Sequence, residues 1–215
     1  MNATGSGLPR RRDEARALFR NAILDAAEVV FAERGFHGAR IQDIAARARI
    51  AVGTVYNHFE QKEDVLSALL EERMEELLAQ LQPRRDDPGG FRERLETRIE
   101  RMLGYVHRHR SFFAIANDHG LFSGSAAPVG RAAARPLRQM EDFRSVLRVL
   151  VEEGIASGDL EALHPDALAR FLAGTMRVFV LSSLLQSDTD ARACASLIGD
   201  LFLHGAGRRR SRRGK

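Results

Sequence analysis

The sequence predicts an all-α protein in two parts, a small N-terminal domain of three helices and a larger helical domain. Apolar residues recur at helical spacing through most of the 215-residue chain, and no stretch keeps the alternation of a β-strand. Two predicted helices of about two turns each are joined by only four residues, 48–51. The segment "PRRDDPGG" at residues 83–90 interrupts the pattern and marks a domain boundary.

Four helices are expected before that boundary. The first runs from about residue 14 to 34 and stops at Gly35, because glycine readily takes the conformation that ends a helix. The second covers residues 41–47, and the third begins at Val52. The fourth covers residues 62–82 and would be roughly 31 Å long.

Five further helices are expected beyond the boundary. Pro136 and Pro165 suit first-turn positions, where the missing N–H costs nothing. Residues 120–135 are rich in Gly, Ala and Ser and receive no assignment. The expected helices cover residues 91–110, 112–118, 136–156, 165–186 and 190–204.

The third helix has two contrasting faces. Four apolar residues lie on one side, and four small or polar residues, without a long charged side chain, lie on the other. A face of this kind lets a helix enter a DNA groove about 12 Å wide. We therefore interpret residues 41–59 as a helix-turn-helix; the alternative is a helical hairpin with a solvated polar face. The apolar residues are Val52, Val55, Tyr56 and Phe59, and the others are Gly53, Thr54, Asn57 and His58.

The segments "AILDAAEVVFAERGFHGAR" (residues 22–40) and "IQDIAARARIAVGTVYNHFEQKEDVL" (residues 41–66) resemble the DNA-binding domain of the tetracycline-repressor (TetR) family. The D-I-A-x-x-A, G-T-x-Y-x-H-F and K-E-x-x-L patterns occur in order, and the match spans about residues 16–70. The expected organisation is a disordered basic arm (1–14), a DNA-binding domain (15–61), a connecting helix (62–82), a ligand-binding and dimerisation domain (83–207) and a disordered basic tail (208–215).

The resemblance also implies the residues that meet DNA. Thr54, Tyr56 and Lys62 would contact phosphates, while the neighbouring small residues would lie against bases or backbone. Three consecutive arginines at residues 10–12 could follow the minor groove or the backbone. The expected DNA-binding residues are Gln42, Gly53, Thr54, Tyr56, Asn57, His58 and Lys62.

Three positions depart from the family pattern. Arg49 stands where the turn usually has glycine, so it must adopt a left-handed or altered conformation. Ala51 replaces the usual serine N-cap of the third helix, at a cost of about 1 kcal/mol, and Gln61 is a poorer cap than serine for the fourth. We expect these changes to weaken the domain without altering its fold.

The C-terminal half is rich in large apolar side chains. Most should form the core, and the family resemblance implies that some line a cavity for an apolar or aromatic effector. The helix at 165–186 is apolar nearly all round, so it should be buried on two sides. It could form a four-helix dimer interface with the last helix; the alternative is the central helix of a monomer core. Candidate ligand-binding residues are Met102, Tyr105, Phe112, Phe113, Phe143, Leu147, Phe171, Met176 and Phe179.

Other chemistry receives little support. The sequence has no nucleophile elbow, phosphate-binding loop or dinucleotide fingerprint, so neither an enzyme nor a cofactor is expected. His107 and His109 point about 200° apart on their helix and cannot share a metal, so no metal site is expected. Cys194, the single cysteine, is expected to be a structural thiol in a cytoplasmic protein.

Charge separates along the chain although the net value is only +4. Residues 208–215 carry six basic and no acidic side chains, which suits a polyanion. The expected function is a ligand-responsive repressor: a homodimer that binds a palindromic double-stranded DNA operator and is released by a small apolar or aromatic effector. The alternative is a helical adaptor or membrane-surface protein whose basic tail binds anionic lipid.

Overall fold

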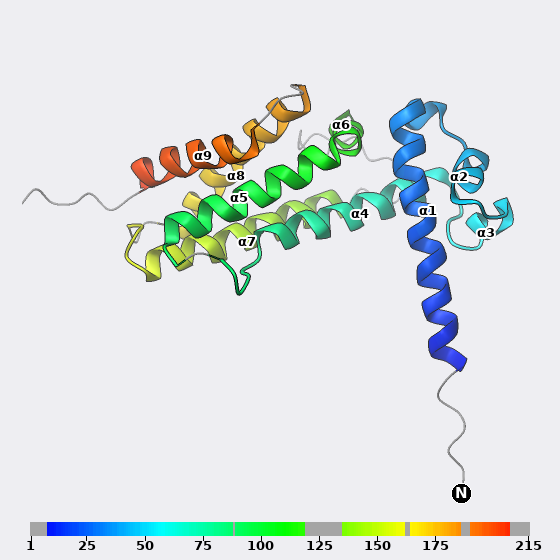
Figure 1. Cartoon of the computed structure of the whole chain (residues 1–215), viewed down its shortest axis with the longest axis horizontal. Helices are drawn as coiled ribbons and strands as arrows, with labels where there is room; N and C mark the ends of the chain where they lie inside the picture. The colour runs from blue at the N-terminus through cyan, green and yellow to red at the C-terminus, as the bar shows by residue number, and fades with distance from the viewer. Residues whose placement is uncertain (1–7, 88, 119–134, 162–163, 186–189, 207–215) are drawn as a thin grey trace, which may run out of the picture.

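A computed structural model describes residues 8–87, 89–118, 135–161, 164–185 and 190–206. Every regular element within those ranges is a helix, which confirms the predicted all-α fold (Figure 1). The observed boundaries agree with the predicted ones to within a few residues, except at the N-terminus. The helices are α1 (Leu8–Gly38), α2 (Ile41–Ala48), α3 (Val52–Tyr56), α4 (Lys62–Leu81), α5 (Phe91–Arg108), α6 (Arg110–Asp118), α7 (Arg135–Ala156), α8 (Pro165–Leu185) and α9 (Ala191–Ala206).

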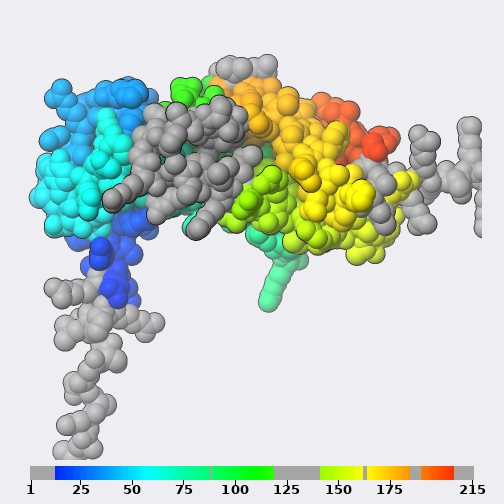
Figure 2. Space-filling view, turned by 180° about the vertical axis from the view of Figure 1, so that it is seen from behind, coloured from blue at the N-terminus to red at the C-terminus, as the bar shows by residue number. Residues whose placement is uncertain are grey.

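The first helix begins earlier than expected. The predicted disorder over residues 1–14 is wrong for residues 8–14, which are helical, while residues 1–7 lie outside the described part of the chain. Arg, Ala, Leu and Glu favour helix here, and Pro9 lies in the first turn, where it interrupts no hydrogen bond. The N-terminal part of α1 therefore projects beyond the domain (Figures 1 and 2). The predicted break at Gly35 is confirmed by its φ of 68° and ψ of 164°.

The three residues that depart from the family pattern lie at helix ends in the N-terminal domain. Arg49 adopts the expected left-handed conformation, with φ 57° and ψ 42°. Ala51 provides no side-chain cap for α3, as expected. At α4, however, the Asp64 carboxylate accepts the backbone N–H of Gln61 at 3.1 Å. A carboxylate three residues inside the helix therefore compensates in part for the poor cap.

The larger domain is built around α4 and α5. Helix α4 leaves the N-terminal domain, packs along α5 and reaches α7, while α9 packs on α5 and α8 on α7 (Figure 1). The loop after α4 is tied to α5, because Asp87 accepts hydrogen bonds from Arg98 at 3.1 Å and Arg101 at 2.8 Å. Burial raises the pKa of Asp87. The backbone N–H of Arg84 and the two guanidinium groups together lower it by more, so the net shift of the pKa is downward.

Candidate functional site

Helix α3 presents a polar face at the surface of the N-terminal domain. Val55 is fully buried and sets the rotation of the helix, which leaves the opposite side in solvent. A Cβ atom at Gly53 would meet no atom within 4 Å, so another backbone can approach closely here. The predicted DNA-binding residues Gln42, Gly53, Tyr56 and Asn57 are exposed, whereas Thr54 and His58 are half-buried.

The imidazole of His58 lies beside α1. Its ring centroid is 6.5 Å from that of Phe19 and 6.4 Å from that of Phe59. Burial lowers its pKa, and the nearby guanidinium groups of Arg16 and Arg20 lower it further. The ring is therefore neutral at neutral pH and can form a hydrogen bond without carrying a charge.

Lys62 has a structural role that the sequence did not reveal. Its Nζ donates to the carbonyl oxygens of Phe36 at 2.7 Å and Ala39 at 2.9 Å. The same ammonium lies 4.5 Å from the centroid of the Phe36 ring. It therefore holds the start of α4 against the end of α1, and these two carbonyl oxygens use two of its three N–H groups.

A charge cluster joins the two domains at Arg73 of α4. The Arg73 side chain is only 7% exposed, and it donates to Glu28 at 2.7 Å and Asp25 at 3.0 Å, both on α1. It also donates to Glu76, one turn along α4, at 3.0 Å. Burial lowers the pKa of Arg73, but the hydrogen bonds and charges of these carboxylates raise it more. Arg73 therefore stays charged and clamps α4 to α1.

Helix α5 and the residue after it reach the same cluster. The hydroxyl of Tyr105 donates to Glu76, and Nδ1 of His109 lies 2.8 Å from a carboxylate oxygen of Glu28. Burial raises the pKa of Tyr105, and its hydrogen bond with Glu76 raises it further, so the phenol remains protonated. The larger domain is thereby linked to α1 directly through His109 and also through α4.

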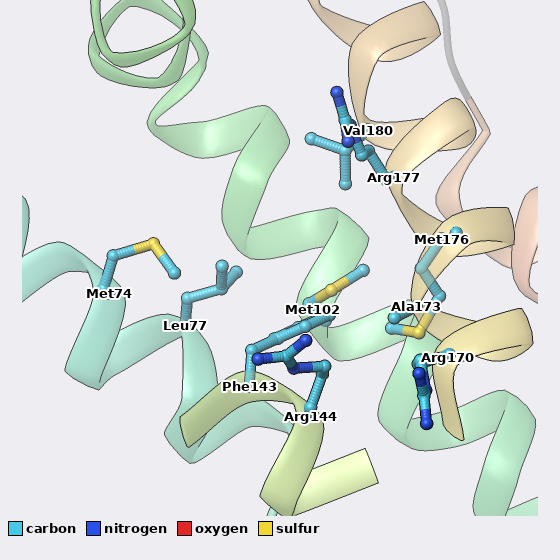
Figure 3. Close-up of a pocket in the computed structure, with 11 residues that line it drawn as sticks. Met74, Leu77, Met102, Phe143, Arg144, Arg170, Ala173, Met176, Arg177 and Val180 are labelled. Atoms are coloured by element: carbon cyan, nitrogen blue, oxygen red, sulfur yellow. The ribbon is translucent and has the colours of Figure 1, made fainter. Parts of the chain in front are cut away.

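A cavity of about 250 Å³ lies between α4, α5, α7 and α8 (Figure 3). Its apolar walls come from all four helices, and their side chains point toward a common space in the close-up. The deeper walls are buried, whereas Gly174 on α8 is exposed and marks an opening. The apolar lining residues are Met74, Leu77, Met102, Phe143, Ala173, Met176 and Val180.

Three exposed arginines also line this cavity: Arg144 on α7, and Arg170 and Arg177 on α8. Arg144 and Arg170 also line a second, polar hollow beside it, together with Arg148 and the carboxylates of Glu141 and Asp166. Arg170 Nε donates to the backbone carbonyl of Asp166 at 3.3 Å. Among the described residues, no carboxylate forms an ion pair with any of the three cavity arginines, whereas Arg148 pairs with Glu152 at 2.9 Å. Guanidinium groups left in this way suit an anionic ligand group.

The structure brings three of the nine predicted ligand-binding residues to this cavity: Met102, Phe143 and Met176. The other six lie elsewhere. Tyr105 belongs to the interdomain cluster, and Phe112, Phe113 and Leu147 are fully buried in the core. Phe171 lies on the outer face of α8, stacked on Phe202 at 6.3 Å between centroids, and Phe179 packs against the core.

The residues predicted from the sequence do not include Met74 and Leu77 of α4 or the three arginines. The sequence contains a pattern that could have identified the α8 residues, since Arg170, Ala173 and Arg177 recur at i, i+3 and i+7 and so share one face of the helix. A search for apolar and aromatic residues alone passes over such a mixed stripe.

The outer face of α8 and α9 is apolar and open. The expectation that α8 is buried on two sides is wrong for the single chain, because this face has no cover among the described residues. The stretch Pro165–Leu184 is long and apolar enough to cross a membrane by length and composition alone, and 28% of its most apolar window is buried. The exposed apolar residues are Phe171, Val178, Leu197 and Leu201, each 49–61% exposed.

The sequence is similar to those of known bacterial regulators. Residues 23–69 match the family described as bacterial regulatory proteins, tetR family. The Fatty acid metabolism regulator protein of Bacillus subtilis is 28% identical over 197 residues, which cover 85% of this chain and 93% of that protein. The HTH-type transcriptional repressor KstR2 of Mycobacterium tuberculosis is 29% identical over 161 residues, covering 75% and 79%.

A solved structure supports the fold. The transcriptional regulator FadR from Bacillus subtilis, in complex with stearoyl-CoA, aligns with a TM-score of 0.71 at 24% identity. The alignment covers 86% of this chain and 97% of that one. The arrangement of the N-terminal helices, α4 and the larger helical domain is therefore shared.

Proposed function

Because this chain belongs to the tetR family of bacterial regulatory proteins and is a DNA-binding transcriptional regulator, we propose that it is a repressor released by a fatty-acyl-CoA. The acyl chain would occupy the cavity between α4, α5, α7 and α8. The expected apolar or aromatic effector is thereby replaced by one with an apolar chain and an anionic head.

One observation carries the proposal: a mostly apolar cavity is bordered by three arginines without an ion-pair partner among the described residues. Burial of an acyl chain is favourable by about 0.8 kcal/mol per CH₂ group. Arg144, Arg170 and Arg177 would bind the phosphates of the CoA portion outside. The comparisons support this ligand class, since the similar regulator of Bacillus subtilis is named for fatty acid metabolism and the FadR structure from that organism holds stearoyl-CoA.

The DNA-binding part of the proposal uses the exposed face of α3. Tyr56, Thr54 and the remaining N–H of Lys62 would contact phosphates, and Asn57, His58 and Gly53 would lie against bases or backbone. Gln42, also exposed, would contact DNA from the start of α2. Each chain supplies one such reading head.

The active form would be a two-fold dimer joined through the outer faces of α8 and α9, where apolar side chains are exposed. The two heads would then read a palindromic operator with half-sites about 34–36 Å apart, or a multiple of that distance. No catalytic role is proposed, and the proposed location is the cytoplasm.

The test begins with sequencing of DNA fragments retained by the purified full-length chain. Affinity for the selected operator is then measured with and without saturating acyl-CoA, free fatty acid and CoA. We expect acyl-CoA to weaken operator binding about 5- to 150-fold, the usual range of allosteric coupling. Binding of acyl-CoA without any change in operator affinity would reject the proposal.

A pair of variants adds a control. Arg144→Ala combined with Arg170→Ala should weaken acyl-CoA binding and leave operator binding intact, because both side chains lie at the cavity and far from α3. Arg192→Ala, which removes an exposed arginine from α9, should change neither affinity.

A further inference from the structure

The cavity is small for the ligand class proposed above. An engineered apolar cavity of about 150 Å³ holds benzene, which amounts to roughly 25 Å³ for each carbon. On that scale the cavity of about 250 Å³ holds about ten carbons. A stearoyl chain, with about eighteen carbons, would need roughly 450 Å³. The similar regulator that holds stearoyl-CoA shares the fold of this protein. The cavity here, however, has room for only part of a stearoyl chain.

Three methionines from three different helices occupy the apolar part of the cavity. Met74 of α4, Met102 of α5 and Met176 of α8 are 6%, 1% and 0% exposed. Figure 3 shows Met102 between the α4 side chains and the α8 side chains, in the middle of the lining. Their side chains fill volume that would otherwise enlarge the cavity.

The arginines at the cavity determine where the anionic head of the ligand binds. The cavity is exposed at Arg144, Arg170 and Gly174, and a Cβ atom at Gly174 would meet nothing within 4 Å. An anionic head held by those guanidinium groups fixes where the acyl chain enters. The volume that the three methionines help to enclose then limits how many methylenes leave water.

We propose that this cavity selects medium-chain acyl-CoA, with an acyl chain of about ten carbons, and that Met102 and Met176 set the limit. The proposal rests on the acyl-CoA function proposed above and adds the length of the chain. Each methylene that fits should tighten binding about fourfold, the equivalent of 0.8 kcal/mol, until the cavity is full. Further methylenes stay in water and add nothing.

The experiment is calorimetric titration of the full-length chain with hexanoyl-, octanoyl-, decanoyl-, lauroyl-, palmitoyl- and stearoyl-CoA. The wild-type affinity should rise steeply to decanoyl-CoA and then level or fall. Met102→Ala removes three heavy atoms, or roughly 75 Å³, so its optimum should move about two to three carbons longer, to lauroyl-CoA. Met102→Leu preserves the volume and should keep the wild-type profile.

For each variant, the affinities for acyl-CoAs of different length are compared within one preparation. Their ratios do not depend on the folded fraction, so a lower stability of Met102→Ala does not affect the result. Met176→Ala provides an independent enlargement from α8. A wild-type affinity that keeps rising through stearoyl-CoA would overturn the chain-length limit, although the proposed function would stand. An unchanged optimum in both alanine variants would overturn the role of the methionines. Failure of every acyl-CoA to bind would instead overturn the proposed function, and the inference with it.

Discussion

At the residue scale, two exposed neighbours at the end of α3 are expected to act differently. Tyr56→Ala should weaken binding to operator and scrambled DNA alike, by about tenfold, because a phosphate contact is independent of sequence. Asn57→Ala should instead change which bases are preferred. The measurement is affinity on both DNAs for each variant. If Tyr56→Ala leaves both affinities unchanged, the placement of the DNA-reading helix is wrong.

Lys62 is a less informative probe of the same interface. Its ammonium already bonds the carbonyls of Phe36 and Ala39, so its removal disturbs the contact between α1 and α4 as well as any phosphate. Tyr56, which is 50% exposed, can be truncated with little effect on the core. A loss of DNA affinity in a Tyr56 variant therefore reports on the interface itself.

At the element scale, α4 and α5 each contribute to both the cavity and the interdomain cluster. On α4, Met74 lines the cavity and the adjacent Arg73 binds α1. On α5, Met102 lines the cavity, and Tyr105, one turn later, donates to Glu76. A ligand that shifts α5 against α4 therefore disturbs the contacts that hold α1, which is a direct physical route between the sites.

Tyr105→Phe tests that route. The variant loses one hydrogen bond to Glu76 but keeps the ring against Phe113 and His109. We expect effector affinity to stay the same and the effector-induced loss of operator affinity to fall by about fivefold, equal to about 1 kcal/mol of coupling. The readout is operator affinity with and without saturating acyl-CoA. A weakened effector affinity with undiminished release would instead place Tyr105 at the ligand, as the sequence predicted.

At the scale of the whole molecule, the exposed face of α8 and α9 is expected to determine the oligomeric state. Val178 is 61% exposed on α8, so Val178→Asp should leave the fold of the single chain intact. In a dimer the same carboxylate would be buried without a partner, which is unfavourable by several kcal/mol. We therefore expect a monomer with much weaker operator binding.

Light scattering at micromolar concentration measures this change, and thermal unfolding confirms that the chain is folded. Val149→Asp is the matched control, because Val149 is 54% exposed on α7, away from the apolar α8 and α9 face. A Val178→Asp variant that remains dimeric would exclude α8 from the interface.

The sequence by itself determined the helices and the polar face of α3. Helical period and the break at Gly35 are properties of residues close together in the chain, so pattern and propensity predict them. The left-handed Arg49 was expected from the family resemblance, because the family usually has glycine at that turn. The polar side of α3 follows from the same local geometry. Helix propensity also accounts for the helix over residues 8–14, where the prediction of disorder is wrong.

Only the tertiary structure decided what each buried side chain faces. Periodicity shows that Met102 and Phe112 are both buried, yet one lines the cavity and the other fills the core. The contact of Arg73 with Glu28 joins residues 45 positions apart, and the packing of the helices, not any local pattern, brings them together. Burial is a property of one helix face, whereas a site is a property of several faces that meet, and the chain's local pattern does not specify how they meet.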